Sequence, residues 1–441
     1  MEETMNQNTS SSAQIRRLCH TLEASVSPYH CIKEAERQLS AASFQPLSLT
    51  ENWQLQAGGR YFINAFDSTL LAFSLPEHIP SSSRPLRLRL AAAHTDWPCL
   101  KVKPSPEVST GRYGKLNVEV YGGPILNTWL DRPLSMAGKV CRMTEDPFHP
   151  ETIFVHHPQP LFTIPNLAIH MNREINKGME YNPQTDMLPL AAVLTEELDR
   201  DHFFLNFLAQ EAGTDPEDIL DYEIYLYNTD PAQTLGLKGE FLSSPRLDNI
   251  TSVQACLTGL TEGSCHDGIC GIVLYDNEEV GSFTKQGADS QLLERVLEKI
   301  FLSLGLDRQA LLNSLMSGLM LSLDVAHAMH PNHPEKCDIK NQIVMGDGLA
   351  IKLAASQAYA TDASWASVIE GLCRKNHIPF RKFSNRSDIR GGSTLGSISS
   401  ALLNMPTVDA GVPILAMHSS REVMHINDQE ALEELTRVFF S

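Results

Sequence analysis

The fold of this chain is constrained most by a set of short apolar runs, each followed by a side chain of a type that binds metals. Four such runs lead into a histidine or a carboxylate: residues 86–93 into His94, residues 269–275 into Glu278 and Glu279, residues 319–323 into Asp324, and residues 412–417 into His418. In an open α/β sheet, ligands lie outside the carboxyl ends of the strands, so side chains from distant parts of the sequence meet there. The pattern therefore predicts an α/β sheet with a functional site along one edge.

The length of the chain points to more than one core. At 441 residues it fits two domains, or one large domain with an insertion. Strand-like and helical segments alternate before residue 103 and again after residue 247, whereas the strand-like pieces between them are separated by proline and glycine. We therefore expect an α/β domain split into residues 1–103 and 237–441, interrupted by a smaller, mostly β domain at residues 104–236.

Several elements can be placed within this outline. The Gly58-Gly59 pair between residues 53–55 and 61–64 predicts a β-hairpin, and residues 168–171 predict a strand of the inserted domain. Apolar residues at helical spacing predict helices at residues 15–22, 31–39, 201–212, 249–260, 290–304, 362–375, 393–403 and 429–440.

Charge and cysteine usage exclude several classes of protein. The net charge of −18 argues against a nucleic-acid surface or an anionic membrane, because both are bound through basic patches. The nine cysteines include no C-x-x-C pair, the first dozen residues lack the apolar core of a secretory signal, and no apolar run is long enough to cross a bilayer. We expect a soluble, cytoplasmic protein with reduced thiols.

The side chains at the strand ends match the needs of a hydrolase with two divalent metals. Such a site requires a bridging carboxylate, further His and carboxylate ligands, and a base that accepts a proton from water. Glu278 would be the base, and Asp96 would orient the imidazole of His94, two residues before it. The ligands would be His94, Asp248, Glu279, Asp324 and His418.

Each of these residues has a plainer explanation when taken alone. Asp248 precedes a helix and is in the place of an N-cap, the Glu278-Glu279 pair is typical of a solvated acidic turn, and His94 and His418 could be core histidines. Five such placements in one chain favour the metal site over coincidence.

The order of these residues resembles the aspartyl aminopeptidase family of two-metal aminopeptidases. The resemblance covers nearly the whole chain, through residues 58–62, 94–96, 244–249, 276–282, 324–332 and 417–419. It implies two divalent ions, zinc above all, with cobalt or manganese at an exchangeable position. One ion would be held by His94, Asp248 and Asp324, the other by Asp248, Glu279 and His418, and Glu278 would be the general base.

The resemblance also implies an assembly and a substrate. It implies a catalytic α/β/α sandwich with a mixed sheet, an inserted dimerisation domain and a homododecamer, in which His170 completes the active site of a neighbouring subunit. The implied substrates are peptides with an acidic N-terminal residue, whose side chain would meet Lys352. Gly392, Ser393 and Thr394 of the glycine-rich segment would bind substrate.

Two positions depart from the family pattern, and two other functions stay open. Trp97 stands where a small residue is more usual, and Arg390 stands near a wall that often carries proline or a small residue. Both bear on substrate preference. The alternatives are an aminopeptidase of neutral or broad preference and a non-catalytic scaffold of the same fold, although a scaffold has no need of Glu278 or of a complete ligand set.

Overall fold

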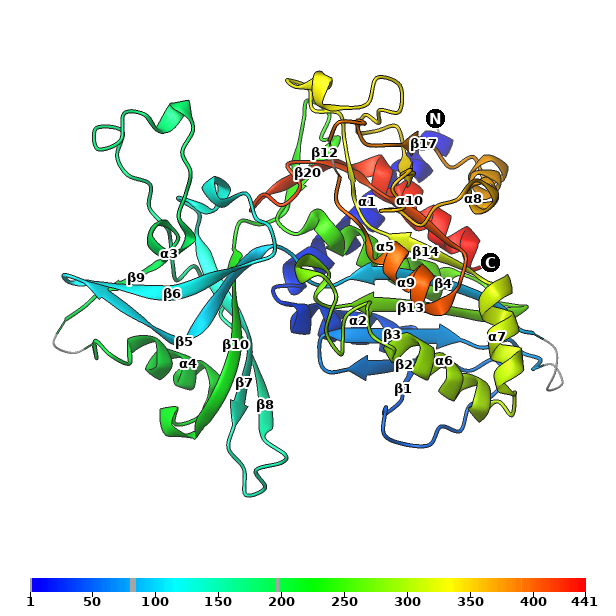
Figure 1. Cartoon of the computed structure of the whole chain (residues 1–441), viewed down its shortest axis with the longest axis horizontal. Coiled ribbons are helices and arrows are strands. Elements are labelled where there is room, and N and C mark those ends of the chain that lie inside the picture. The colour runs from blue at the N-terminus through cyan, green and yellow to red at the C-terminus, as the bar shows by residue number, and fades with distance from the viewer. Residues whose placement is uncertain (1, 80–84, 196–197, 390) are drawn as a thin grey trace. The chain divides into compact units, whose positions relative to one another are not determined.

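The computed structural model describes residues 2–79, 85–195, 198–389 and 391–441. Contacts divide the chain into two compact units (Figure 1). Unit 1 consists of the residues up to Asp96 together with 232–417 and 422–441, and unit 2 consists of Trp97–Pro231 and His418–Arg421. The transitions at 96/97 and 231/232 lie a few residues from the expected boundaries, since the strand that begins at Cys99 runs on through residue 103.

Unit 1 is built on a mixed nine-stranded sheet. Its four central strands, in the order β13-β4-β14-β18, run parallel, while β3 and β16 flank them antiparallel. In sheet order the strands are β1 (Gln45–Pro46), β2 (Arg60–Ala65), β3 (Thr69–Ser74), β13 (Gly268–Tyr275), β4 (Arg87–His94), β14 (Leu319–Leu323), β18 (Thr407–Gly411), β16 (Leu349–Lys352) and β17 (Phe380–Phe383).

Helices cover both faces of this sheet, which gives the α/β class that the sequence predicted. The helices of unit 1 are α1 (Glu2–Ala24), α2 (Pro28–Ala41), α5 (Leu247–Glu262), α6 (Leu292–Ser303), α7 (Arg308–Ser317), α8 (Ala363–Lys375), α9 (Leu395–Leu403) and α10 (Ile426–Phe439). Alternate residues of β13, such as Ile269 and Val273, share a buried cluster with α6 and α7. On the opposite face the thiol of Cys270 lies against the carbonyl of Phe440, at the end of α10.

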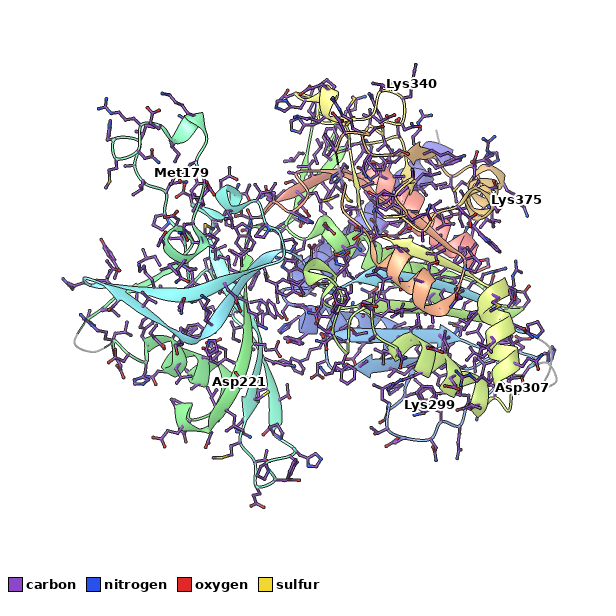
Figure 2. All side chains as sticks on the ribbon, in the orientation of Figure 1. Met179, Asp221, Lys299, Asp307, Lys340 and Lys375 are labelled. Carbon is purple, nitrogen blue, oxygen red and sulfur yellow. The ribbon has the colours of Figure 1, made fainter. Side chains whose placement is uncertain are left out.

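Local contacts explain why the helices of the α6–α7 layer form where they do. Asp307, labelled in Figure 2, accepts the N–H of Ala310 at 2.8 Å and so caps the start of α7. Short acidic side chains are favoured at this position because they accept such an N–H. Lys299 of α6 places its ammonium over the ring of Trp53, a member of this cluster, 4.3 Å from the ring centroid.

The predicted hairpin at Gly58-Gly59 is wrong. Residues 53–55 form no strand, and β2 instead pairs antiparallel with β3 through the turn at Phe66 and Asp67, both with positive φ. Gly59 is required for packing, because a Cβ there would lie 2.5 Å from the ring of Tyr61.

The run at residues 412–417 also differs from the prediction. It contains β19 (Pro413–Leu415), which belongs to a second, five-stranded sheet of unit 1 and not to the nine-stranded one. That sheet has the order β11 (Gln233–Leu235), β12 (Phe241–Ser244), β20 (Glu422–His425), β19 and β15 (Ala326–His327). β18 of the nine-stranded sheet ends at Gly411, before this run begins. The run is apolar because its residues are buried in the smaller sheet.

Unit 2 is a six-stranded antiparallel sheet with α4 (Phe203–Ala212) packed against it. The strand order is β8 (Glu151–His156), β7 (Leu134–Arg142), β10 (Ile219–Asn228), β5 (Cys99–Thr110), β6 (Tyr113–Tyr121) and β9 (Leu190–Val193). The strand predicted at residues 168–171 is absent: the N–H groups of Met171 and Asn172 bond to the carbonyl of Ala168, which closes a turn. Ile169 and Met171 are exposed, so the alternation there does not mark a buried face.

None of the described helices combines the length and the apolar character that a bilayer-spanning segment needs. The nine cysteines all lie within the described residues, and none of them is joined in a disulfide.

Candidate metal centre

Three neighbouring parallel strands of unit 1 bring the predicted ligands together. His94 ends β4 opposite Tyr275 of β13, and Asp324 follows β14 on the other side of β4. The first turn of α5 adds Asp248. The Nε2 atom of His94 lies 3.4 Å from Oδ1 of Asp248 and 3.8 Å from Oδ1 of Asp324. One imidazole nitrogen and two carboxylate oxygens therefore converge in a buried place.

The electrostatics of this cluster suit a cation. Burial lowers the pKa of His94, but contacts with Asp248, Asp324 and Asp96 raise it, and the net pKa is well above its usual range. Carboxylates that favour the protonated form of a buried imidazole also attract a metal ion. Imidazole nitrogen and carboxylate oxygen are ordinary ligands of zinc. The residues present thus fit a divalent metal.

The two adjacent glutamates come from the short turn after β13. The turn runs from Asn277, which has a φ of 63°, to Gly281, which has a φ of 100°. The side chains of Glu278, Glu279 and His94 are close enough together to share an ion. Burial and the nearby carboxylates raise the pKa of Glu278, His94 lowers it, and the net value is about 7. A carboxyl with such a pKa can both take and give a proton near neutral pH.

Asp96 ties this turn to His94. Its two carboxylate oxygens accept the backbone N–H groups of Glu278 at 3.2 Å and of Glu279 at 3.1 Å. The same carboxylate lies 3.4 Å from Nδ1 of His94, and the Asp96 carbonyl lies 3.0 Å from that nitrogen. Since Asp96 is 0% exposed, it orients the ligand and the turn and does not itself reach substrate.

Two residues that the sequence prediction missed hold Asp248 in place. Glu422, at the start of β20, accepts the N–H of Asp248 at 3.0 Å. Asn249 donates from its side chain to the carbonyl of Leu323 at 2.9 Å, which joins the start of α5 to the residue before Asp324. Glu422 is four residues after His418 in the sequence, but nothing in the sequence indicates that its side chain is buried.

Lys352 lies inside the cluster. It is 1% exposed, and its Nζ atom lies 3.3 Å from Oδ2 of Asp324, the oxygen that does not face His94. The ammonium also lies 5.3 Å from the centroid of the Tyr359 ring. Burial lowers the pKa of Lys352, but Asp324, Tyr359 and Asp409 raise it, and the net direction is upward. Lys352 is thus a buried cation and not a solvated surface lysine.

The glycine-rich segment is divided between surface and interior. Gly392 and Ser393 are exposed, where they are accessible to a substrate. Thr394 is buried, and its hydroxyl donates to Oδ1 of Asp409 at 2.6 Å. Arg390 lies outside the described residues, and Trp97 is buried.

The two remaining predicted histidines belong to unit 2. His418 opens the segment His418–Arg421, where its Nδ1 atom lies 3.1 Å from the carbonyl of Gly123. His170 is exposed in the turn after Ala168. The ligand role of His418 and the role of His170 in a neighbouring site stay predictions.

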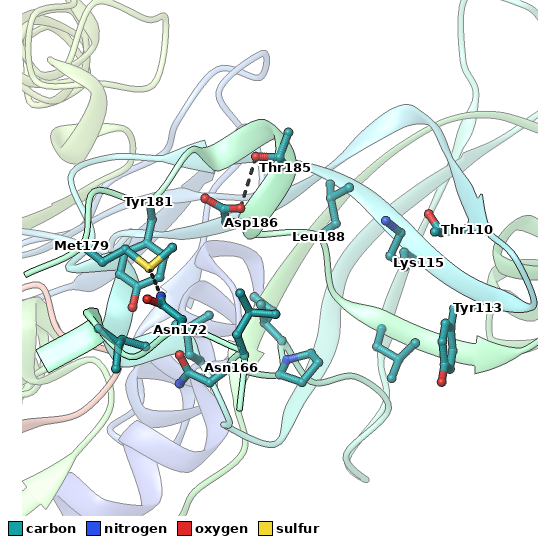
Figure 3. Close-up of a pocket in the computed structure, with 16 residues that line it drawn as sticks. Thr110, Tyr113, Lys115, Asn166, Asn172, Met179, Tyr181, Thr185, Asp186 and Leu188 are labelled. Carbon is teal, nitrogen blue, oxygen red and sulfur yellow. Dashed lines mark hydrogen bonds between the residues drawn. The ribbon is translucent and has the colours of Figure 1, made fainter. Parts of the chain in front are cut away.

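Unit 2 also has a cavity of its own, of about 500 Å³, which contains none of the predicted site residues (Figure 3). Its wall includes Lys115 and Asp186, and Asn172 donates to the sulfur of Met179 at 3.3 Å across one side.

Comparison with known proteins agrees with this geometry. The aminopeptidase I zinc metalloprotease family (M18) matches residues 21–440. A probable M18 family aminopeptidase 2 of Clostridium novyi is 43% identical over 91% of this chain and 92% of the relative, and one of Clostridium acetobutylicum is 40% identical over 97% and 98%.

Solved structures give the same result for the fold. Ape4, in its complex with Nbr1, superposes with a TM-score of 0.93 at 31% identity, covering 98% of this chain and 86% of Ape4. An M18 aminopeptidase of Thermotoga maritima has a TM-score of 0.86 at 20% identity over 98% and 97%, which shows the shared fold. The resemblance drawn from the sequence blocks is confirmed. A ligand cluster at the ends of three parallel strands, in a chain matched almost from end to end, places this protein in the M18 family of zinc metallo-aminopeptidases.

Proposed function

We propose that this M18 aminopeptidase uses two divalent ions to remove N-terminal residues from peptides, with a preference for Asp and Glu. The observation that carries the proposal is the convergence of His94, Asp248 and Asp324 beside the Glu278-Glu279 turn. The first ion would be held by His94, Asp248 and Asp324, and the second by Asp248, Glu279 and His418. Zinc is the proposed metal at both positions, and cobalt or manganese could replace it at the exchangeable one.

Divalent ions bound there would polarise the scissile carbonyl and lower the pKa of water toward about 7. The chain itself would move the proton. The Glu278 carboxylate would accept it from the attacking water and deliver it to the leaving amine. Asp96 holds the Glu278 N–H and so fixes the turn that presents the base.

Lys352 supports the acidic preference. It places a cation in the interior of the site, with Asp324 between it and His94. The net charge of −18 would repel an acidic peptide at long range, so the attraction has to come from a local charge in a closed place where screening by water is weak. Family resemblance at this position points the same way.

An aminopeptidase of neutral or broad preference is the second candidate. The same ion pair favours it, because Asp324 neutralises part of the Lys352 charge that an acidic side chain would need. The two candidates share the metal chemistry and differ only in the residue that they release.

We further propose that unit 2 mediates dimerisation within a homododecamer and that His170 enters a neighbouring active site. Support comes from the family resemblance and from the exposed apolar side chains around His170, which are Leu167, Ile169 and Met171.

A panel of aminoacyl substrates (Asp, Glu, Leu, Ala and Lys) tests the function. Hydrolysis is measured before chelation, after chelation, and after zinc, cobalt or manganese is restored. Metal-dependent release that favours Asp or Glu is the expected result. A preference for Leu or Ala would keep the mechanism and overturn the specificity, and an assembled protein that is inactive with every metal would overturn the proposed reaction.

A further inference from the structure

Asp409 is a buried carboxylate in the middle of the nine-stranded sheet that the proposed reaction does not use. It lies on β18, between Ser322 of β14 and the end of β16, and it is 0% exposed. Burial raises its pKa, whereas the nearby Ser322 hydroxyl, the hydrogen bond from Thr394 and the charge of Lys352 lower it, and the net direction is upward. A buried carboxylate is stable only when polar groups bind its oxygens. The groups that bind Asp409 therefore identify the parts of the chain that it holds in place.

Each oxygen of Asp409 binds a different loop. Oδ1 accepts the hydroxyl of Thr394 at 2.6 Å, at the end of the glycine-rich segment that precedes α9. Oδ2 accepts the N–H of Ala360 at 2.6 Å, and the N–H of Asp409 donates to the hydroxyl of Thr361 at 2.8 Å. Ala360 and Thr361 belong to the loop between β16 and α8. The carboxylate therefore joins two loops that are not adjacent in the sequence.

The helix that follows the glycine-rich segment leaves room for this arrangement. A Cβ at Gly396 in α9 would lie 2.5 Å from Oδ1 of Asp409 and 2.7 Å from the Cβ of Ser322. Only a residue without a side chain lets the helix approach the strands closely enough for Thr394 to reach the carboxylate.

The two loops are joined to each other as well. The N–H of Thr394 donates to the carbonyl of Ala358 at 3.3 Å, and Asn385 donates to the hydroxyl of Tyr359 at 3.1 Å. Tyr359 provides the ring beneath the Lys352 ammonium, which in turn contacts Asp324. A continuous set of contacts thus runs from Thr394 through Asp409 and the Tyr359 loop to Lys352.

We propose that Asp409 and Thr394 are positioning residues that set substrate affinity. The hydrogen bond between them fixes the exposed Gly392 and Ser393 in the glycine-rich segment. It also fixes the loop between β16 and α8, whose Tyr359 ring contacts the Lys352 ammonium. The inference rests on the proposed aminopeptidase function, because it assigns these loops to the substrate side of that site. We expect loss of these contacts to raise KM and to leave kcat nearly unchanged, since neither residue is a proposed metal ligand or proton carrier.

The sharpest test is Thr394→Val, which removes the hydroxyl and keeps the shape, with Thr394→Ser as the rescue. We expect Thr394→Val to raise KM about tenfold, because a hydrogen bond to a charged acceptor is lost. We expect kcat and bound zinc to change less than about twofold, and Thr394→Ser to behave as the wild type does. Asp409→Ala should raise KM further, and if it does not fold, the Thr394 pair decides alone.

Asp428 supplies a matched control in the same unit. This buried carboxylate, like that of Asp409, accepts one hydrogen bond on each oxygen, here from the backbone N–H groups of Gly346 at 2.7 Å and Gly348 at 2.8 Å, in the turn before β16. Asp428→Ala should lower the thermal midpoint without raising KM. An unchanged KM in Thr394→Val would overturn the proposal, and so would an equal rise in KM in Asp428→Ala.

The substrate in this test is whichever N-terminal residue the wild type prefers in the panel. A wild type that prefers Leu would contradict the proposed acidic specificity, while the effect of Thr394→Val on KM for Leu would still decide the role of the Asp409 contacts.

Discussion

The carboxylate of Glu422 accepts the backbone N–H of Asp248 at 3.0 Å, so the proposed bridging ligand is held through its main chain by a second buried acid. Glu422→Ala would leave that N–H without this acceptor, a loss that costs about 1–3 kcal/mol in a buried place. We expect a lower thermal midpoint and weaker zinc retention during dialysis against a chelator. Glu422→Gln keeps an acceptor oxygen and should stay close to the wild type; equal zinc retention in Glu422→Ala and the wild type would contradict this role.

Glu278→Gln should abolish most activity without loss of metal. The amide keeps the size of the side chain but cannot accept a proton, and general-base catalysis is worth about 10²–10⁴ in rate. The measurements are kcat and zinc content on the same preparation. Glu262→Gln, which changes a partly exposed glutamate paired with Arg17, is the control and should leave kcat unchanged. Substantial activity in Glu278→Gln would exclude Glu278 as the base.

Lys352→Met should reduce discrimination between acidic and neutral N-terminal residues. Methionine fills a similar volume without the ammonium, and the loss of a charge-assisted contact of about 1.5–3 kcal/mol corresponds to roughly 10–100-fold in kcat/KM for Asp or Glu. The ratio of kcat/KM for Asp to that for Leu is the quantity to compare. If the ratio stays at the wild-type value, Lys352 serves Asp324 alone.

Glu433 should make the stability of unit 1 depend on pH. Burial raises its pKa to about 7, although Gln429 and Arg17 bond to its carboxylate and lower it. The folded state therefore keeps a proton that the unfolded state loses near pH 4.5. The stability that this proton provides is present below pH 4.5 and is lost as the pH rises to about 7, a difference of about 3 kcal/mol.

Thermal midpoints of the wild type and Glu433→Gln, measured between pH 5 and pH 8, test this sign. The amide carries no titratable proton, so we expect its midpoint to fall less than that of the wild type over this range. Asp428, whose pKa burial also raises to about 7, titrates in both proteins and cancels in the comparison. Parallel curves for the two proteins would show that Glu433 is ionised in the folded state throughout.

The sequence predicted candidate ligands at the ends of β4, β13 and β14 because each strand is buried on both faces as it approaches its carboxyl end, and a histidine or a carboxylate follows there. A buried parallel strand has this pattern whatever its position in the sheet. The run before His418 has the same pattern but belongs to a different sheet, since apolar composition shows that a strand is buried without showing which neighbours it pairs with.

The supporting residues could not be predicted in the same way. Asp96 was found because it stands two residues from His94, whereas Glu422 and Asp409 act on residues far from them in the sequence. When a carboxylate accepts a backbone N–H, the donor can be almost any type of residue, so the sequence gives no sign of the pair. Only the folded chain shows these pairs, whereas the prediction that Thr394 binds substrate came from the family resemblance.

The strand order also bears on how the protein is made. β4 lies between β13 and β14, and both of its neighbours follow it in the chain only after the whole of Trp97–Pro231. During synthesis, residues 88–93 of β4 therefore leave the ribosome with two unpaired strand edges, and the second edge stays unpaired until residue 323 has been added. The arrangement that gathers the predicted ligands thus leaves this strand without either of its partners until most of the chain has been made.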